Sequence, residues 1–209
     1  MHVLVTTQAR TAVRYQKILD AALGVFASRG YREAAVDDIA SAAETSKGGI
    51  YFHFPGKQAI FMALLDRSSN LLLSRIVAAV ESQTEPVAKA DAALLAVLDL
   101  FGGHRSLARL FLVEAMGAGP EFHARIVALY DRFADLIRRN LDEAIVNGTI
   151  APLDTRIASL IWFGALNQIV TSWALTENPP PLRDSYPALR GMLLRSIGVD
   201  PANTPDARQ

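Results

Sequence analysis

Cysteine is absent from the 209 residues of this chain, which excludes disulfide bonds and thiolate metal sites. An excess of one charge is also lacking, because 21 Lys and Arg residues balance 21 Asp and Glu residues, and this argues against a general polyanion binder. No uninterrupted apolar run approaches the roughly 18 residues that a membrane-spanning helix needs. The first ten residues lack the charged start and apolar core of a signal peptide. We therefore expect a cytoplasmic protein that has no membrane partner.

The two-residue alternation typical of a β-strand is also missing, whereas helical periodicity runs through most of the chain. With a hydrophobic fraction of 51%, the chain can bury the cores of a small domain and a larger one. Helices are predicted at residues 11–28, 36–43, 47–54, 57–80, 87–101, 105–116, 121–147, 154–176 and 186–197, separated by Gly, Pro, Asn or Ser clusters. The predicted fold is all-α: an N-terminal three-helix helix-turn-helix domain over 1–56, a C-terminal helical ligand-binding and dimerisation domain over 57–198, and a disordered tail over 199–209.

The helix-turn-helix prediction rests on residues 31–57, where two short helices are joined by a tight polar turn. Ile50 and Phe54 lie four residues apart and are expected to anchor the second short helix inward. The outward face of that helix then consists of Lys47, Gly48, Gly49, Tyr51, Phe52 and His53. Two glycines there cost about 1 kcal/mol each relative to alanine, and two aromatic side chains would be exposed. A surface that approaches a DNA groove explains both features.

These residues and their spacing resemble the TetR family of transcriptional regulators. The matching positions are Gly30-Tyr31, Asp38-Ile39-Ala40, Ser46-Lys47-Gly48, Tyr51, His53-Phe54 and Lys57. The rest of the chain resembles the family only in its length and helical architecture. The resemblance implies a DNA-binding regulator in which Lys47, Gly48, Gly49 and Phe52 approach bases. It also implies that Tyr51, His53 and Lys57 hold phosphates of double-stranded operator DNA.

Two positions depart from the family pattern. Ala34-Ala35 replaces a Thr/Ser pair, so the first short helix lacks a hydroxyl cap, which is worth about 1 kcal/mol. Glu44 replaces the glycine of the turn and would be strained if the turn requires a positive φ. Neither departure removes the outward face of the second helix.

Plainer interpretations stand beside the DNA-binding one. Tyr51 and His53 could form a half-buried aromatic pair, and Lys57 could be an ordinary solvated charge. Arg10 and Arg14 could form an arm over the DNA backbone or only a solvated face. His53 has no second ligand three or four residues away, so no metal is expected. Because the P-loop, the Rossmann glycine pattern and the G-x-S-x-G motif are also absent, we expect neither an enzyme nor a cofactor.

The predicted helix over 154–176 is apolar nearly all round, which indicates burial on more than one face. A second copy of the chain is the simplest partner, and the final helix would complete a four-helix bundle across a homodimer. Asn167 and Gln168 interrupt this apolar stretch. They could fix the register of the dimer, or one of them could face a ligand.

The middle helices carry the prediction of a ligand pocket. Its candidate ligand-binding residues are Phe111, Glu114, Tyr130, Phe133, Trp162 and Asn167. An ordinary core is the plainer interpretation for most of them. The aromatic lining favours an elongated hydrophobic effector, such as a fatty acid or acyl thioester. The leading hypothesis is a repressor that its ligand releases from DNA. The alternatives are a dimeric DNA-binding module without effector response, and a helical enzyme or binding protein that has kept the fold.

Overall fold

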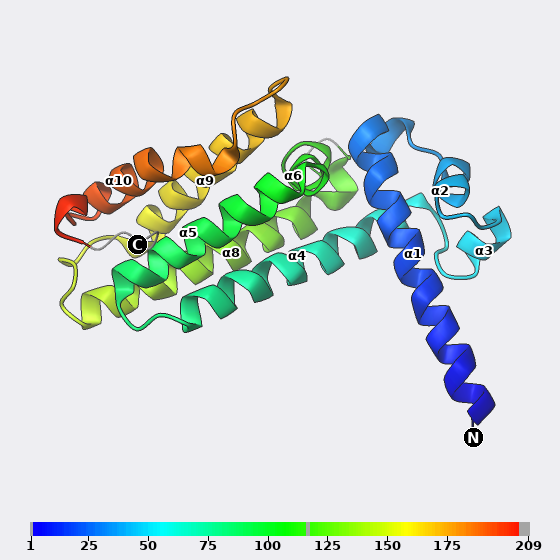
Figure 1. Ribbon diagram of the computed structural model, residues 1–209, viewed down its shortest axis with the longest axis horizontal. Coiled ribbons are helices and arrows are strands. Elements are labelled where there is room, and N and C mark those ends of the chain that lie inside the picture. Colours follow the sequence, from blue (N-terminus) through cyan, green and yellow to red (C-terminus); the bar gives the residue numbers. More distant parts are fainter. Residues whose placement is uncertain (1, 116–117, 205–209) are drawn as a thin grey trace.

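The structure is a computed structural model that describes residues 2–115 and 118–204 (Figure 1). Helices and their connections make up all of this described part, and no strand occurs within it. The elements are α1 (His2–Glu33), α2 (Val36–Ala42), α3 (Lys47–Tyr51), α4 (Lys57–Glu81), α5 (Pro86–Gly103), α6 (Arg105–Arg109), the π-helix η1 (Leu110–Glu114), α8 (Pro120–Val146), α9 (Thr155–Leu175), the 3-10 turn η2 (Leu182–Ser185), α10 (Tyr186–Ser196) and the 3-10 turn η3 (Pro201–Asn203). The predicted all-α fold is confirmed.

The molecule has two parts of unequal size (Figure 1). Helices α1 to α3 gather at one end, and α4 leaves them to run along the length of a larger helical bundle. Helix α5 returns beside α4 towards the small domain, α8 lies next to α5, and α9 and α10 form the outer layer. The bundle is therefore joined to the three-helix domain through α4 and through the segment α6–η1, which lies beside α1.

Apolar periodicity explains why the short helices hold together. Ile39 of α2, which packs on α1, and Ile50 of α3 are fully buried, and Phe54 stacks on Tyr15 of α1 with ring centroids 4.8 Å apart. The predicted inward anchors Ile50 and Phe54 are thus confirmed. An apolar core of this kind supplies most of the stability of helices too short to form alone.

Four aromatic rings join the two parts of the molecule. Phe26 and Tyr31 of α1, Phe61 of α4 and Phe122 of α8 pack with neighbouring centroids 4.6 to 5.8 Å apart. Edge-to-face packing at such distances adds to the stabilisation from burial alone. These rings place α4 and α8 in direct side-chain contact with α1.

Several boundaries differ from the sequence-based expectation, including the end of α3, which lies at Tyr51 rather than at residue 54. Helix α1 begins at His2 rather than at residue 11, although Gly30 breaks it as predicted, with φ 79°. The helix expected over 105–116 is divided into α6 and η1, and residue 116 lies outside the described residues. The tail expected to be disordered from residue 199 is ordered as far as Thr204, because Arg190 donates to Thr204 Oγ1 and Asp200 caps η3. Residues 205–209 lie outside the described part.

Candidate functional site

Helix α3 is held so that one face is buried and the other is open. Ser46 caps it, with its Oγ accepting a hydrogen bond from the backbone N of Gly49 at 3.1 Å. With Ile50 inward, Tyr51 and Phe52 are 48% and 77% exposed, and His53 lies half-buried with its ring edge-on to those of Tyr15 and Phe52. Burial in the core of the domain therefore does not account for the aromatic side chains of Tyr51 and Phe52.

The two glycines of α3 differ in their structural need. A Cβ added at Gly49 would lie 2.5 Å from Thr45 Oγ1, so packing against the preceding turn favours glycine there. A Cβ added at Gly48 would find its nearest neighbour, Ser46 Oγ, at 3.8 Å, which is ordinary contact. The fold therefore explains the glycine at position 49 but not the one at Gly48. A glycine at Gly48 would allow a partner to approach the backbone closely.

Lys47, at the start of α3, forms an exposed ion pair with Asp37 of α2 at 2.9 Å. The hydrogen bond and charge of Asp37 raise the pKa of Lys47 above its ordinary value. The lysine therefore stays cationic, and an exposed pair of this kind is weak enough to exchange Asp37 for another anion.

The turn between α2 and α3 contains the anticipated strain. Glu44 has φ 50°, the left-handed conformation that the usual glycine adopts freely. Its carboxylate pairs with Lys17 of α1, and this hydrogen bond and charge hold the pKa of Glu44 below its ordinary value. At the missing cap of α2, Asp38 Oδ2 accepts from the backbone N of Ala35 at 3.0 Å. Both departures from the family pattern thus have local compensation.

Lys57 does not lie where a phosphate-binding side chain is expected. Its Nζ donates to the carbonyl oxygens of Tyr31, Arg32 and Ala34 at 2.8 to 2.9 Å, and it lies 4.8 Å from the centroid of the Tyr31 ring. An ammonium group has three donors, and all three are occupied. Lys57 instead caps the carbonyls that the break at Gly30 leaves open.

A cavity of about 140 Å³ lies inside the bundle, and apolar side chains from α4, α5, η1, α8, α9 and α10 make up most of its wall. Of the predicted ligand-binding residues, Phe111, Tyr130, Phe133, Trp162 and Asn167 line it. Tyr130 donates to the carbonyl of Phe111 at 3.2 Å, and burial raises the pKa of its hydroxyl. Protein interiors contain few voids larger than a water molecule, so this space is more than ordinary packing.

Glu114 is the exception among the predicted cavity residues. It lies outside the cavity wall, and its Oε2 accepts a hydrogen bond from the backbone N of Tyr31 at 3.0 Å. Nearby, Arg109 Nε donates to the carbonyl of Ala27 at 3.0 Å. The prediction failed because the π-helix η1 rotates Glu114 away from Phe111, a rotation that regular helical spacing does not anticipate. Both residues belong to the contact between the bundle and α1.

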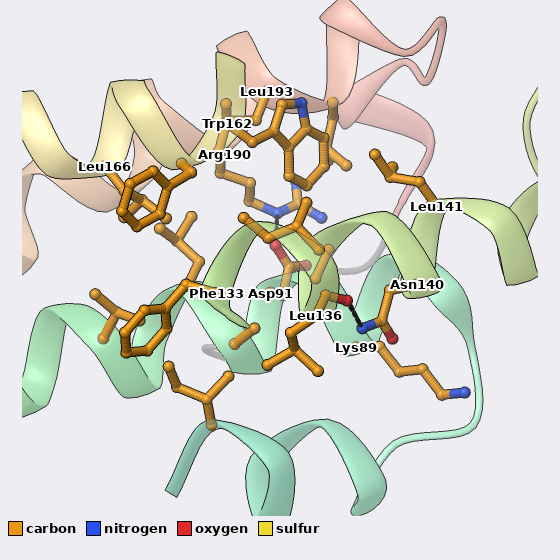
Figure 2. A pocket seen from close by; sticks show the side chains of 18 of the residues that line it. Lys89, Asp91, Phe133, Leu136, Asn140, Leu141, Trp162, Leu166, Arg190 and Leu193 are labelled. Atoms are coloured by element: carbon orange, nitrogen blue, oxygen red, sulfur yellow. Dashed lines mark hydrogen bonds and ion pairs between the residues drawn. The ribbon is translucent and has the colours of Figure 1, made fainter. Parts of the chain in front are cut away.

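Sequence reasoning missed a buried ion pair at the cavity wall (Figure 2). Asp91 of α5 and Arg190 of α10 are both buried, with Arg190 Nε donating to Asp91 Oδ1 at 2.8 Å. A signal was available, since Asp91 shares an otherwise apolar helix face with Leu94 and Leu98. The partner, 99 positions later, could not be identified from spacing alone.

The structure separates the two polar residues of α9. Asn167 lines the cavity, whereas Gln168 lies on the exposed side of the helix. That exposed side also presents Ile157, Ile161 and Leu175. Within the described part of the chain, α9 is the one helix long and apolar enough to cross a membrane by length and composition. Its inward side instead packs on α8 and, through Trp162 and Ser196, on α10.

Comparison with known proteins supports the geometry of both parts. The family described as "Bacterial regulatory proteins, tetR family" matches residues 18–64, and "Tetracyclin repressor-like, C-terminal domain" matches 83–173. The transcriptional repressor DhaR of Mycobacterium sp. strain GP1 is 30% identical over 166 residues, covering 76% of this chain and 82% of the repressor. The fatty acid metabolism regulator protein of Bacillus subtilis is 26% identical over 165 residues, covering 78% of this chain and 85% of that protein. The crystal structure of the Bacillus subtilis regulator FadR in complex with stearoyl-CoA has a TM-score of 0.82 and 25% identity, covering 88% of this chain and 99% of that one.

Proposed function

Because this chain belongs to the TetR family of transcriptional regulators, we propose that it represses transcription as a homodimer on palindromic operator DNA until a hydrophobic effector fills its cavity. Its relatives are transcriptional regulators, and the chain is a regulator rather than an enzyme. The cytoplasm, where bacterial DNA lies, is the proposed place of action.

One observation carries the proposal: a single short segment touches both the cavity and the DNA-binding domain. In η1, Phe111 and Leu112 line the cavity, while Glu114 accepts from the backbone of Tyr31. Arg109, one turn earlier, donates to Ala27 of α1. A ligand that displaces Phe111 therefore acts on the same segment that sets the orientation of α1. It can shift the equilibrium only by binding one orientation better than the other.

The DNA contacts are proposed on the exposed face of α3. Lys47, Gly48, Gly49 and Phe52 would approach bases, and Tyr51 and His53 would hold phosphates. Lys57 is removed from this set, since its three donors bind backbone carbonyls. Its role is to fix the end of α1 and thereby to orient the domain that presents α3.

The proposed effector is an acyl thioester or a fatty acid. Apolar side chains dominate the cavity wall, as an alkyl chain requires. The Bacillus subtilis relative has been crystallised with stearoyl-CoA, which supports this class for a chain of similar fold. The same cavity disfavours the alternative of a DNA-binding module without effector response.

The proposed dimer uses the exposed side of α9 together with α10. Ile157 and Ile161 on α9 and Met192 on α10 are large apolar side chains left exposed in one copy of the chain. A Cβ added at Gly164, on the same side of α9, would meet nothing within 4 Å, so a neighbouring helix could approach closely there. Two-fold symmetry would then present two α3 helices to successive turns of DNA.

A gel-shift experiment with the DNA upstream of the protein's own gene tests the proposal. We expect a discrete complex that stearoyl-CoA dissociates and that free coenzyme A leaves intact. A complex that resists stearoyl-CoA, palmitic acid and shorter acyl thioesters alike would contradict the proposed effector class. Absence of any complex at low salt would contradict the DNA-binding role itself.

A further inference from the structure

The buried ion pair at the cavity wall leaves one strong acceptor unused. Asp91 Oδ1 accepts from Arg190 Nε, but Asp91 Oδ2 is buried and has no hydrogen-bond partner among the described residues. Asp91 itself is only 2% exposed and lines the cavity. A buried carboxylate oxygen without a donor is destabilising, because it has lost its hydration and gained nothing in return.

Arg190 does not donate a hydrogen bond to Asp91 Oδ2. Its guanidinium also donates to the carbonyl of Pro201 at 3.4 Å and to Thr204 Oγ1 at 3.0 Å, both of them in the C-terminal segment. Arg190 is thus held between α5 and this segment. Two other polar side chains of the cavity wall have partners elsewhere (Figure 2): Asn140 donates to the carbonyl of Leu136 at 2.8 Å, and Lys89 Nζ donates to Glu143 Oε1 at 2.5 Å. Among the described residues no side chain supplies the donor that Asp91 Oδ2 lacks, and the cavity that Asp91 lines can hold a ligand that does.

We propose that the ligand of this cavity is an elongated apolar molecule with an alcohol group at its buried end, and that this hydroxyl donates to Asp91 Oδ2. The inference rests on the proposed effector function and narrows it. A saturated chain ending in a methyl group fills the apolar wall but leaves the carboxylate oxygen unpaired. A chain that ends in a hydroxyl group fills the apolar part of the cavity and also donates to the carboxylate oxygen of Asp91.

The charges of Asp91 and Arg190 determine which polar group of a ligand fits beside them. Arg190 already neutralises Asp91, so an ammonium group at this position would leave one uncompensated positive charge in an apolar cavity. A carboxylate would meet the negative charge of Asp91 and could gain little from Arg190, whose donors serve Asp91, Pro201 and Thr204. A neutral hydroxyl supplies the donor and adds no net charge.

The position of the pair also gives the ligand a direction. Helix α4 runs away from the small domain and α5 returns, so Asp91 in the first half of α5 lies in the part of the bundle remote from α1 to α3 (Figure 1). Phe111 and Leu112 line the opposite part, next to α1. The hydroxyl end would therefore be fixed far from the DNA-binding domain, with the apolar body extending towards η1.

A matched pair of small probes isolates the hydrogen bond. 1-Octanol and 1-methoxyheptane have the same number of non-hydrogen atoms, but only the alcohol can donate. Titration calorimetry on the full chain is expected to show the alcohol binding at least about tenfold more tightly, which corresponds to about 1.4 kcal/mol. This ratio is within the range for a hydrogen bond to a charged group. Equal affinities would show that Asp91 Oδ2 needs no ligand donor and would overturn the inference while leaving an apolar effector site intact.

Three variants separate the role of Asp91 from that of the surrounding wall. Asp91→Asn can still accept from Arg190 and then presents an amide donor to the cavity, so the preference for the alcohol should disappear. If this variant fails to fold, the double variant Asp91→Leu with Arg190→Met removes both charges, and it should prefer the ether. The control Asn140→Leu should keep the wild-type ratio of alcohol affinity to ether affinity.

Persistence of the alcohol preference in the double variant, or its loss in Asn140→Leu, would overturn the assignment to Asp91. Failure of both probes to bind the wild type would contradict the apolar ligand site as well.

Discussion

At the scale of single residues, the adjacent glycines of α3 show how one sequence pattern can have two causes. Gly49 has a neighbour, Thr45 Oγ1, at the position that a side chain would take, whereas a side-chain carbon at Gly48 would make only an ordinary contact with Ser46 Oγ. The cost of glycine in a helix is therefore explained by packing at one position only. At Gly48 the glycine destabilises the helix and no packing contact requires it. This is expected where a binding partner, rather than the fold, requires glycine.

Gly48→Ala should separate stability from function. The substitution fits the available space and restricts the unfolded chain, so we expect unfolding to become harder by up to about 1 kcal/mol. DNA affinity should fall at least about tenfold, because the added methyl group lies on the surface proposed to enter the groove. Chemical denaturation and a gel shift measure the two effects. A variant that is more stable and binds DNA as well as the wild type would refute close approach at Gly48.

Lys57→Met tests the structural role of this lysine. The variant keeps an apolar stem of similar length but loses three hydrogen bonds to backbone carbonyls, so we expect unfolding to become easier by about 1 to 3 kcal/mol. The salt dependence of DNA binding should be unchanged, whereas loss of a phosphate contact would lower its slope by about 0.9. Binding measured at several salt concentrations distinguishes the two, and a reduced slope would restore Lys57 to the phosphate-binding set.

At the scale of elements, end signals made most helices predictable. Ser46 and Asp154 cap α3 and α9 through their side chains, and Gly30 and Gly148 adopt the positive φ expected where helices stop. The face of α3 and the apolar outward side of α9 follow from the same local periodicity.

Features that depend on long-range contacts were not predictable. The change to a π-helix at η1 has no sequence signal of its own, so Glu114 was placed on the wrong side. The carbonyls bound by Lys57 and the partner of Asp91 are set by tertiary packing across 23 to 99 residues. Local spacing therefore predicted which side of α3 is exposed, while the contacts of the junction and the polar part of the cavity wall required the fold.

The junction between η1 and α1 is the element whose loss should uncouple ligand from DNA. Glu114→Ala leaves the backbone N of Tyr31 without its partner, whereas Glu114→Gln keeps an accepting oxygen. We expect stearoyl-CoA to weaken DNA binding less in the alanine variant than in the wild type, and nearly normally in the glutamine variant. By thermodynamic linkage, DNA should then also weaken stearoyl-CoA binding less.

The matched control for this experiment is Asp135→Ala, which removes an exposed carboxylate that pairs with Arg138 on α8, away from the cavity wall. It should leave the response to stearoyl-CoA unchanged. If the alanine variant at position 114 released DNA as fully as the wild type, the coupling would have to pass through the aromatic contacts of Phe122 with Tyr31 and Phe61 instead.

At the scale of the whole molecule, one copy of the chain leaves large apolar side chains of α9 and α10 exposed. The exposed side of α9 carries isoleucine and leucine where a solvated helix carries charge, and Met192 of α10 is 69% exposed. One recognition helix also contacts only one half-site, and two must lie about one DNA turn, or roughly 34 Å, apart to bind a palindrome. Self-association through α9 and α10 would remove both deficits with one contact.

Ile161→Arg should therefore turn a dimer into a monomer that still folds. Ile161 is 58% exposed in the single chain, so its replacement costs the fold of one copy little, but an arginine facing its own symmetry mate would be buried against like charge. Sedimentation at micromolar concentration should show the mass of one chain, and operator affinity should fall by two or more orders of magnitude because the half-sites are no longer bound together. Val127→Arg is the control, since Val127 is 57% exposed on α8, and it should leave both the dimer and operator binding intact. If the Val127 variant dissociated while the Ile161 variant remained a dimer, α8 rather than α9 would form the contact, and the spacing of the two α3 helices would have to be derived from that face instead.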